Sequence, residues 1–445
     1  MRTRKMKLLL AAALMGLAGC TVPPATAEAP PQEQARRAPP MLPQASERAW
    51  EEPRSVVEGS TQFGIDLYKR LAEQGGNVFL SPTSLTTAFG LAYAGARGLT
   101  AEEMRRVVHY PAGESVHGEL GALLRQYAID GQGQRLAVAN ALWVQSGFPI
   151  EQSYLGLVRQ HYSAEPRQVD FVRQPARAVA AVNQWAEANT NGRIKGLLTE
   201  QNVDALTRLI LTNTVYMKAD WLKPFEKGAT RQEAFYPHGV PGPAPTPGGM
   251  EPPVRMSFMS QESFFRYMEN GGDGPRFQAV ELPYQGEEMS MVIFLPASPI
   301  GLAEFERALG AQRLHGWLDA LSKAERRNVL LEIPKLKMEA RHSLVPELKA
   351  LGMRRAFSET EADFSGISKA GRLLIDDVLH QTFLEVDEKG TEAAAATAIL
   401  IRTTSAPPTP VVFRANHPFF FLIRHNPTGW VLFIGRVRKP SDLKQ

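Results

Sequence analysis

The order in which helix-type and strand-type patterns follow one another constrains the fold of this chain most. Amphipathic helical patterns dominate from Ser55 to Asn191, and apolar strand-type runs dominate after Leu209. The two kinds of pattern do not alternate as the strand–helix–strand units of a parallel sheet require. The sequence therefore predicts an α+β domain rather than a parallel α/β one.

Four helices are predicted in the first half. Apolar residues lie close to one helical face over 55–71. Ser81 followed by Pro82 is typical of an N-cap and first turn, so a second helix begins there. A capping-box pattern at Thr100 predicts the start of a third helix, and 171–191 is helical again.

Strands dominate the second half, where a Pro- and Gly-rich insertion over 237–253 is interpreted as a loop. The predicted strands are 209–216, 277–282, 290–295, 328–333 and several near the C-terminus, and further helices are predicted over 301–309 and 343–351.

The N-terminus has the features of a secretory leader. A cationic head and a short apolar run precede Leu17-Ala18-Gly19-Cys20, which resembles the bacterial lipoprotein cleavage box, in which the cysteine is acylated. An ordinary secretory signal with an incidental cysteine is the alternative. The following residues are rich in Pro, Ala, Gln and Glu, as in a disordered tether. The expected organisation is a signal peptide over 1–19, a tether over 20–52 and a globular domain over 53–441.

Cysteine content and charge narrow the function. Cys20 is the only cysteine, so no disulfide can form within one chain. The net charge of +4 falls to zero if the leader, with its four cations, is removed. A neutral mature protein gives no reason to expect a nucleic-acid partner.

Motifs of common enzyme classes are absent from the sequence. There is no His-Glu-x-x-His, Gly-x-x-x-x-Gly-Lys-[Ser/Thr] or Gly-x-Ser-x-Gly pattern, and the nine histidines are scattered. The sequence therefore predicts no enzyme activity, no catalytic residue, no metal and no cofactor.

One stretch, 386–410, has an unusual composition for its position. It lies between two strand-like segments, opens with Asp387-Glu388-Lys389-Gly390, and continues through four alanines, Ala393 to Ala396. A linker would favour Gly and Ser, and a surface helix would carry an apolar stripe.

Four separated motifs resemble the serpin family, over about 55–439. Residues 77–85, with Asn-Val-Phe-Leu-Ser-Pro, resemble its early strand-to-helix segment, and 211–221 resemble its central strand followed by Trp221. Residues 387–397 are similar to the hinge of inhibitory members, and 413–419 to the C-terminal signature. The resemblance implies one domain of three β-sheets with eight or nine helices.

In this family the stretch is an exposed reactive-centre loop, here about 388–412, that a protease cleaves. The amino-terminal part of the cleaved loop then inserts into the main sheet and traps the protease as an acyl-enzyme. Side chains alternate across a sheet, and Glu392 must face water, so small residues are expected on the inward face. The implied hinge comprises Glu388, Gly390, Thr391, Glu392, Ala393, Ala394, Ala395, Ala396 and Thr397, with Thr391, Ala393, Ala395 and Thr397 directed inward.

The resemblance also implies where the sheet opens. A polar group lies under the centre of the sheet, and a second group at its top includes an ion pair between Lys335 and Glu388. Each residue alone could be an ordinary structural residue. The implied sheet-opening residues are Ser81, Ser84, Asn213 and His380 at the centre and Trp221 and Lys335 at the top.

The expected scissile bond is Thr404–Ser405, because the cleaved residue commonly lies sixteen positions after the hinge glutamate. Arg402–Thr403 is the alternative, and it would suit a trypsin-like protease. The partner is a serine protease, or alternatively a cysteine protease.

The expected protein is a secreted monomeric inhibitor, anchored through lipidated Cys20 at an outer membrane or cell surface. The alternative function is a non-inhibitory serpin that acts as a binding or chaperone-like surface protein.

Overall fold

The computed structural model describes residues 55–439 except for 114, 127–129, 132–133, 163, 165, 239–251, 273, 299 and 392–408. The expected signal peptide, the tether and most of the reactive-centre loop therefore lie outside the described residues. Among the residues described, no helix is both long and apolar enough to cross a bilayer. The described part contains nine α-helices: α1 (Val56–Ala72), α2 (Pro82–Gly95), α3 (Gly98–Val108), α4 (Ser115–Gln126), α5 (Gln152–Tyr162), α6 (Pro175–Asn189), α7 (Leu302–Ala308), α8 (Ala311–Lys323) and α9 (Val345–Leu351).

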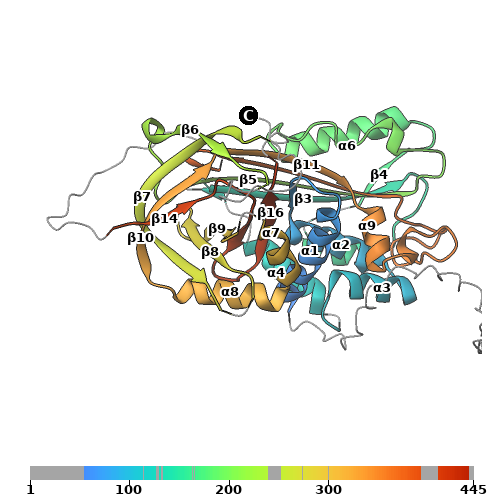
Figure 1. Cartoon of the computed structure of the whole chain (residues 1–445). Helices are drawn as coiled ribbons and strands as arrows, with labels where there is room; N and C mark the ends of the chain where they lie inside the picture. Colours follow the sequence, from blue (N-terminus) through green and yellow to red (C-terminus); the bar gives the residue numbers. More distant parts are fainter. Residues whose placement is uncertain are drawn as a thin grey trace, which may run out of the picture. The chain divides into compact units, whose positions relative to one another are not determined.

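A seven-stranded sheet forms the centre of the domain (Figure 1). Two long strands at its middle run parallel to each other, and its other long pairings are antiparallel. Its strands, in spatial order, are β11 (Leu336–Ser343), β12 (Asp377–Val386), β13 (Gly390–Thr391), β5 (Leu209–Asp220), β3 (Gln134–Gln145) and β2 (Asp130–Gly131), with β4 (Arg167–Val169) paired to β3.

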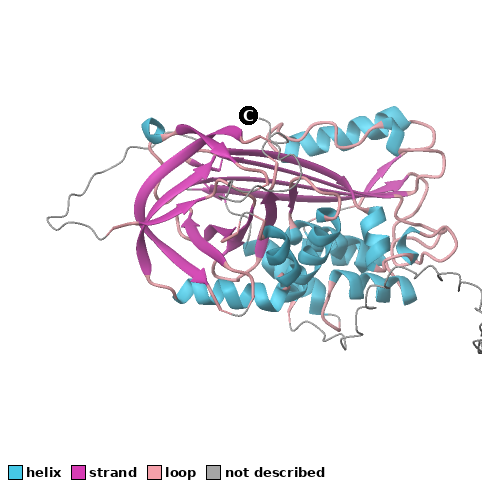
Figure 2. Ribbon diagram, in the orientation of Figure 1, coloured by secondary structure: helices cyan, strands magenta, loops and turns pink. Residues whose placement is uncertain are grey.

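A nine-stranded sheet forms the second layer, and its strands curl around one end of the domain (Figure 2). The order is β1 (Val78–Leu80), β16 (Val431–Val437), β15 (Phe419–His425), β9 (Met289–Pro296), β8 (Phe277–Pro283), β7 (Val254–Asn270), β10 (Arg326–Pro334) and β14 (Val411–Arg414), with β6 (Arg231–Phe235) paired to β7.

The α+β class is confirmed, but two of the three expected sheets are continuous in hydrogen bonding. The reason is the 17-residue strand β7. Its residues 266–270 pair with β8, whereas residues 258–266 pair with β10. Strand β7 therefore pairs with strands of both expected sheets and joins them into one sheet.

Helices cover both faces of the seven-stranded sheet. α2 packs against β3 and β5 on the face where most helices gather, and α6 packs against β3 on the opposite face (Figure 1). The side chains of β5 are buried over nearly its whole length because both faces are covered. The two exceptions, Lys218 and Asp220, lie at the end of β5 that pairs with β13.

The predicted start of α2 is confirmed, because its capping residue directly precedes the helix in the sequence. Ser81 is the N-cap of α2, and its side chain accepts a hydrogen bond from the Ser84 amide. The predicted helix start at Thr100 is wrong, because α3 begins at Gly98 without a side-chain cap. The Thr100 hydroxyl instead accepts a hydrogen bond from the Asp363 amide at 3.1 Å.

Candidate functional site

The two central strands, β5 and β12, are paired only over part of their length. They pair in parallel from Ile210 with Asp377 to Tyr216 with Phe383. Beyond that point β13 lies between them. Thr391 pairs with Val386 of β12 and with Ala219 of β5, antiparallel to both. The first hinge residues therefore already form a short strand in the middle of the sheet.

A tight turn brings the chain from β12 into this position. The carboxylate of Asp387 accepts hydrogen bonds from the amides of Lys389 (2.9 Å) and Gly390 (3.3 Å). A Cβ atom on Gly390 would lie 2.1 Å from the carbonyl oxygen of Ala219. Glycine is needed here because the turn lies directly against the backbone of β5.

Trp221 and Tyr284 hold the turn and the first inserted residue. The indole Nε1 of Trp221 donates to the carbonyl of Asp387 at 3.0 Å, and its backbone amide donates to Lys389. The rings of Trp221 and Tyr284 are stacked with centroids 4.5 Å apart. The hydroxyls of Tyr284 and Thr391 lie 2.9 Å apart, and Thr391 is buried.

Glu388 is the charged residue of the turn, and its side chain is only 5% exposed. Lys335 Nζ lies 2.7 Å from Glu388 Oε2, and the Thr230 hydroxyl donates to Oε1 at 2.8 Å. Burial by itself would raise the pKa of Glu388, but the hydrogen bonds from Lys335 and Thr230 outweigh it and lower the pKa. The structure contains the ion pair between Lys335 and Glu388 that the resemblance implied.

A second polar cluster lies under the middle of the sheet, around His380. The Ser81 amide donates to His380 Nε2 at 3.1 Å, so the ring proton is on Nδ1, which donates to Asn213 Oδ1. The amide nitrogen of Asn213 donates to the Ser84 hydroxyl and to Asn140. The structure thus brings Ser81, Ser84, Asn213 and His380 together.

His380 is neutral in this cluster. It is fully buried, and burial together with the nearby His342 holds its pKa well below 6.5. A neutral ring is required, because Nε2 must accept a hydrogen bond while Nδ1 donates one. The hydrogen bond between His380 and Asn213 therefore joins β12 to β5 six residues along β5 from Ala219, which pairs with the last residue of β13.

Three residues of the site were missed in the sequence. Tyr284 follows β8, Thr230 precedes β6, and Asn140 lies within β3. Their hydrogen-bond partners lie 107, 158 and 73 residues away. A single sequence carries no local signal for contacts of this range.

The described ends of the predicted reactive-centre loop differ from the expectation of an exposed loop over 388–412. Glu388 and Thr391 are buried, because β13 is paired on both sides. At the other end, Val411 and Val412 pair with β10 in strand β14. The residues Glu392 to Thr397, Arg402, Thr403, Thr404, Ser405 and Cys20 lie outside the described residues.

Comparison with known families decides what kind of protein carries this site. The family model described as serpin (serine protease inhibitor) matches residues 58–440. The chain belongs to the serpin family. An uncharacterized serpin-like protein of Thermococcus kodakarensis is 41% identical over 87% of this chain and 86% of that protein.

Other serpins are similar over almost their whole length. The leukocyte elastase inhibitor of Homo sapiens is 33% identical over 86% of this chain and 99% of that protein. The crystal structure of uncleaved ovalbumin matches with a TM-score of 0.75 and 28% identity, over 87% of this chain and all of that one. Serpins are generally protease inhibitors, and inhibitors are among the relatives of this chain.

Proposed function

We propose that this serpin is a suicide-substrate inhibitor of serine endopeptidases. The protease cleaves the reactive-centre loop, the hinge inserts between β5 and β12, and the protease stays attached as an acyl-enzyme. One observation carries the proposal. Gly390 already pairs with β5, and Thr391 pairs with both β5 and β12, antiparallel to each. The hinge thus occupies the first two positions of the strand that insertion would complete.

We extend the register observed at Thr391 through the rest of the hinge, which lies outside the described residues. Thr391 lies between Ala219 and Val386. The residue numbers of these two differ by the same amount as those of every direct β5–β12 pair, such as Asn213 and His380. An inserted strand would therefore separate existing pairs one by one. Moving two residues at a time along the inward face gives Ala393 between Met217 and Leu384, Ala395 between Val215 and Thr382, and Thr397 between Asn213 and His380.

The inward face accounts for the small residues of the hinge. Thr391 is buried on this face, and residues at intervals of two would follow it inward. Ala393 and Ala395 add only a methyl group each between strands that are already packed. A larger side chain would cost overpacking, and a charged one would be buried without a partner. Glu392 belongs to the opposite face.

Thr397 meets the polar cluster. Insertion in this register breaks the hydrogen bond between His380 and Asn213 and offers the Thr397 hydroxyl in its place. Each backbone hydrogen bond that insertion adds contributes about 1 kcal/mol net. One parallel pairing is also replaced by two antiparallel ones, which are slightly more stable per residue. The hydrogen bond between His380 and Asn213 would thus hold the two strands together before insertion, and hydrogen bonds to Thr397 would replace it afterwards.

Covalent trapping of the protease requires cleavage of one defined peptide bond in the reactive-centre loop. The protease serine attacks the carbonyl carbon of Thr404, the bond to Ser405 breaks, and the Ser405 amine leaves. Insertion then distorts the protease before water can hydrolyse the ester at Thr404. Arg402–Thr403 is the alternative bond, but it leaves a shorter strand to insert. A small residue at the cleaved bond suits an elastase-like enzyme, and the human relative is a leukocyte elastase inhibitor.

The N-terminal leader supports a location on a membrane surface. Cys20, acylated after removal of residues 1–19, would hold the inhibitor on a membrane surface. Thr21 in the next position, where Asp would retain a lipoprotein at the inner membrane, favours the outer membrane. The Pro-rich tether would separate the monomeric inhibitory domain from that surface.

A protease panel tests the proposal. The purified protein is mixed with elastase-, chymotrypsin- and trypsin-like enzymes and a papain-like cysteine protease and separated on a denaturing gel. We expect a band at the summed mass with at least one serine protease. Complete cleavage of the loop without such a band across the panel would leave the non-inhibitory surface protein as the better account.

A further inference from the structure

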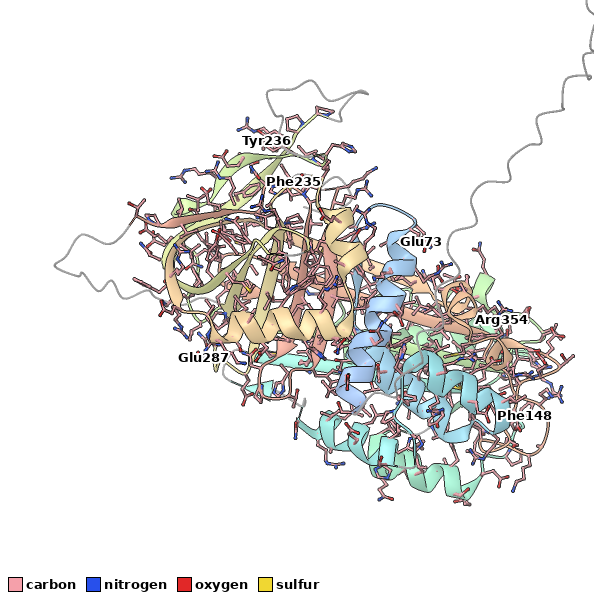
Figure 3. All side chains as sticks on the ribbon, turned by 60° about the horizontal axis from the view of Figure 1, so that its bottom comes forward. Glu73, Phe148, Phe235, Tyr236, Glu287 and Arg354 are labelled. Atoms are coloured by element: carbon pink, nitrogen blue, oxygen red, sulfur yellow. The ribbon has the colours of Figure 1, made fainter. Side chains whose placement is uncertain are left out.

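Helix α4 packs closely against α5 and α2, and glycines allow the close approach. A Cβ atom on Gly121 of α4 would lie 2.6 Å from the carbonyl oxygen of His161 in α5. A Cβ atom on Gly90 of α2 would lie 2.5 Å from the hydroxyl oxygen of Tyr162 in α5. Phe148, shortly before the start of α5, marks this side of the domain in Figure 3. The three helices therefore meet with little free space between them.

His117, in the first turn of α4, lies in this contact. Its Nδ1 atom is 2.7 Å from the hydroxyl oxygen of Tyr162. The centroid of its ring lies 5.7 Å from that of Tyr93 and 5.9 Å from that of Tyr162. Burial raises the pKa of Tyr162 well above its usual range, so the hydroxyl keeps its proton and donates it to Nδ1. The neutral ring of His117 is thus packed between two tyrosines and hydrogen-bonded to one of them.

The charged groups near His117 oppose a proton on its ring. His161 of α5 and Arg97, which follows α2, act on the ring, and both are basic. Tyr93 of α2 lies near a further cation, Arg105 of α3. In the part of the chain that the structure describes, no carboxylate lies close enough to offset these groups. Burial, His161 and Arg97 together lower the pKa of His117 to about 4.

The nearest carboxylates of the neighbouring helices interact with other groups. Glu119 of α4 accepts a hydrogen bond from the backbone amide of Val56, at the start of α1, at 2.9 Å. Glu58 of α1 acts on His315 of α8. The first turn of a helix is moreover the end at which the helix dipole disfavours a cation. A proton on His117 would therefore stay uncompensated among the described residues.

We propose that α4 is an acid-sensitive helix: protonation of His117 releases it from α2 and α5 while the rest of the domain stays folded. With a proton on Nδ1, the ring can no longer accept the hydroxyl proton of Tyr162. A buried cation without a partner is costly, and release of the helix removes this cost by exposing the ring to water. Acid favours the released state because that state binds the proton more tightly. The inference does not depend on the proposed inhibitory function.

Release of α4 would affect the central sheet as well. Leu124 of α4 and residues 138–140 of β3 line one cavity of about 540 Å³. The side chain of Asn140 also accepts a hydrogen bond from Asn213, so this cavity borders the polar cluster around His380. Loss of α4 removes one wall of the cavity, on the side of β3 that leads to the polar cluster.

A buried thiol on α4 tests the proposal. In a Cys20→Ser background, Leu123→Cys supplies the only thiol of the full chain, at a position that is 8% exposed. Dithiodipyridine labels the thiol, and glutathione at the same pH corrects for the reactivity of the thiol itself. His117→Gln removes the titrating ring, and His117→Lys introduces a permanent cation. The controls are Leu318→Cys, at a buried position on α8, and His315→Gln, a histidine whose pKa burial also lowers.

From about pH 7.5 to about pH 5, labelling of Leu123→Cys should accelerate about thirtyfold. This factor is expected for a proton bound with a pKa of about 4 in the docked helix and about 6.5 in the released one. His117→Gln should abolish the acceleration, His117→Lys should give rapid labelling already at neutral pH, and His315→Gln should retain the acceleration.

Labelling of Leu318→Cys should stay slow over the same range, and circular dichroism at neutral pH checks that each variant is folded. An equal acceleration with His117→Gln would overturn the proposal. An equal acceleration at Leu318→Cys would also overturn it, because the whole domain and not α4 alone would then open in acid.

Discussion

The ammonium of Lys335 lies 2.7 Å from the carboxylate of Glu388, and this ion pair fixes the turn from which the hinge enters the central sheet. Glu388 is buried whereas Lys335 is 40% exposed, so the lysine stabilises a negative charge that water cannot reach. Thr230 is the second donor to the same carboxylate.

Removal of this cation should destabilise the hinge. Lys335→Met leaves Glu388 buried with the Thr230 hydroxyl as its remaining side-chain donor. We expect the free energy of unfolding to fall by about 1–3 kcal/mol. Urea titration measures the loss. Lys323→Met, which removes an exposed ion pair with Asp319, is the matched control and should change the value by less than about 0.5 kcal/mol. Similar losses in the two variants would contradict the role of the pair.

The two faces of the hinge should respond differently to a cation. Thr391→Arg requires burial of an unpaired charge, so insertion should slow and the protein should be cut as a substrate. Glu392→Arg carries the same side chain on the opposite face and should still form the adduct. Denaturing gels with one target protease compare the ratio of adduct to cleaved inhibitor. Unchanged adduct yield in Thr391→Arg would refute the assignment of faces.

Acidification should weaken the domain through His380. Burial holds its pKa well below 6.5 in the folded state, so the unfolded chain binds this proton first as the pH falls. Below about pH 6.5 the free energy of unfolding should therefore fall by about 1.4 kcal/mol per pH unit for this group, until the folded-state pKa is reached.

The comparison that isolates this effect uses His380→Gln, which retains every other buried histidine. Urea titrations near neutrality and about one pH unit below 6.5 should show a smaller loss in the variant by about 1.4 kcal/mol. Glu388 acts in a separate window, because its lowered pKa removes stability only as the pH falls below that of an ordinary glutamate. An equal loss in the two proteins would exclude His380 as the responsive group.

Residues close in the chain, and those within the family motifs, could be predicted from the sequence, as Ser81 and Pro82 at the start of α2 illustrate. The partners of Thr391 could not be predicted, because Tyr284 follows a strand of the other sheet and no local pattern specifies the contact. The number of sheets depended on the length of β7, which is set by pairing with strands on both sides. The burial of Glu388 likewise depends on long-range contacts.

The scissile bond has its own test. When the adduct breaks down, mass spectrometry of the released C-terminal peptide should give Ser405 as its first residue. A peptide that begins at Thr403, with a trypsin-like enzyme as the best target, would move the reactive bond to Arg402.

The membrane anchor is tested by Cys20→Ser. Without the thiol no lipid can be attached, so the protein should move from the membrane fraction to the soluble fraction after expression in a bacterium that processes lipoproteins. A variant that still sediments with the outer membrane would show that another part of the chain anchors it.

A reversible lock between β5 and β12 tests the central claim most directly. Thr214 and Gln381 face each other across these strands, and among the described residues the Thr214 hydroxyl and the Gln381 Oε1 are buried without partners. Adjacent strands are about 4.8 Å apart, which is within reach of a disulfide. In a Cys20→Ser background, Thr214→Cys with Gln381→Cys supplies the only thiols. Oxidised, the protein should be cleaved without trapping the protease, and reduction should restore the covalent adduct. Equal adduct yield from the oxidised and reduced forms would show that inhibition does not require β5 and β12 to separate.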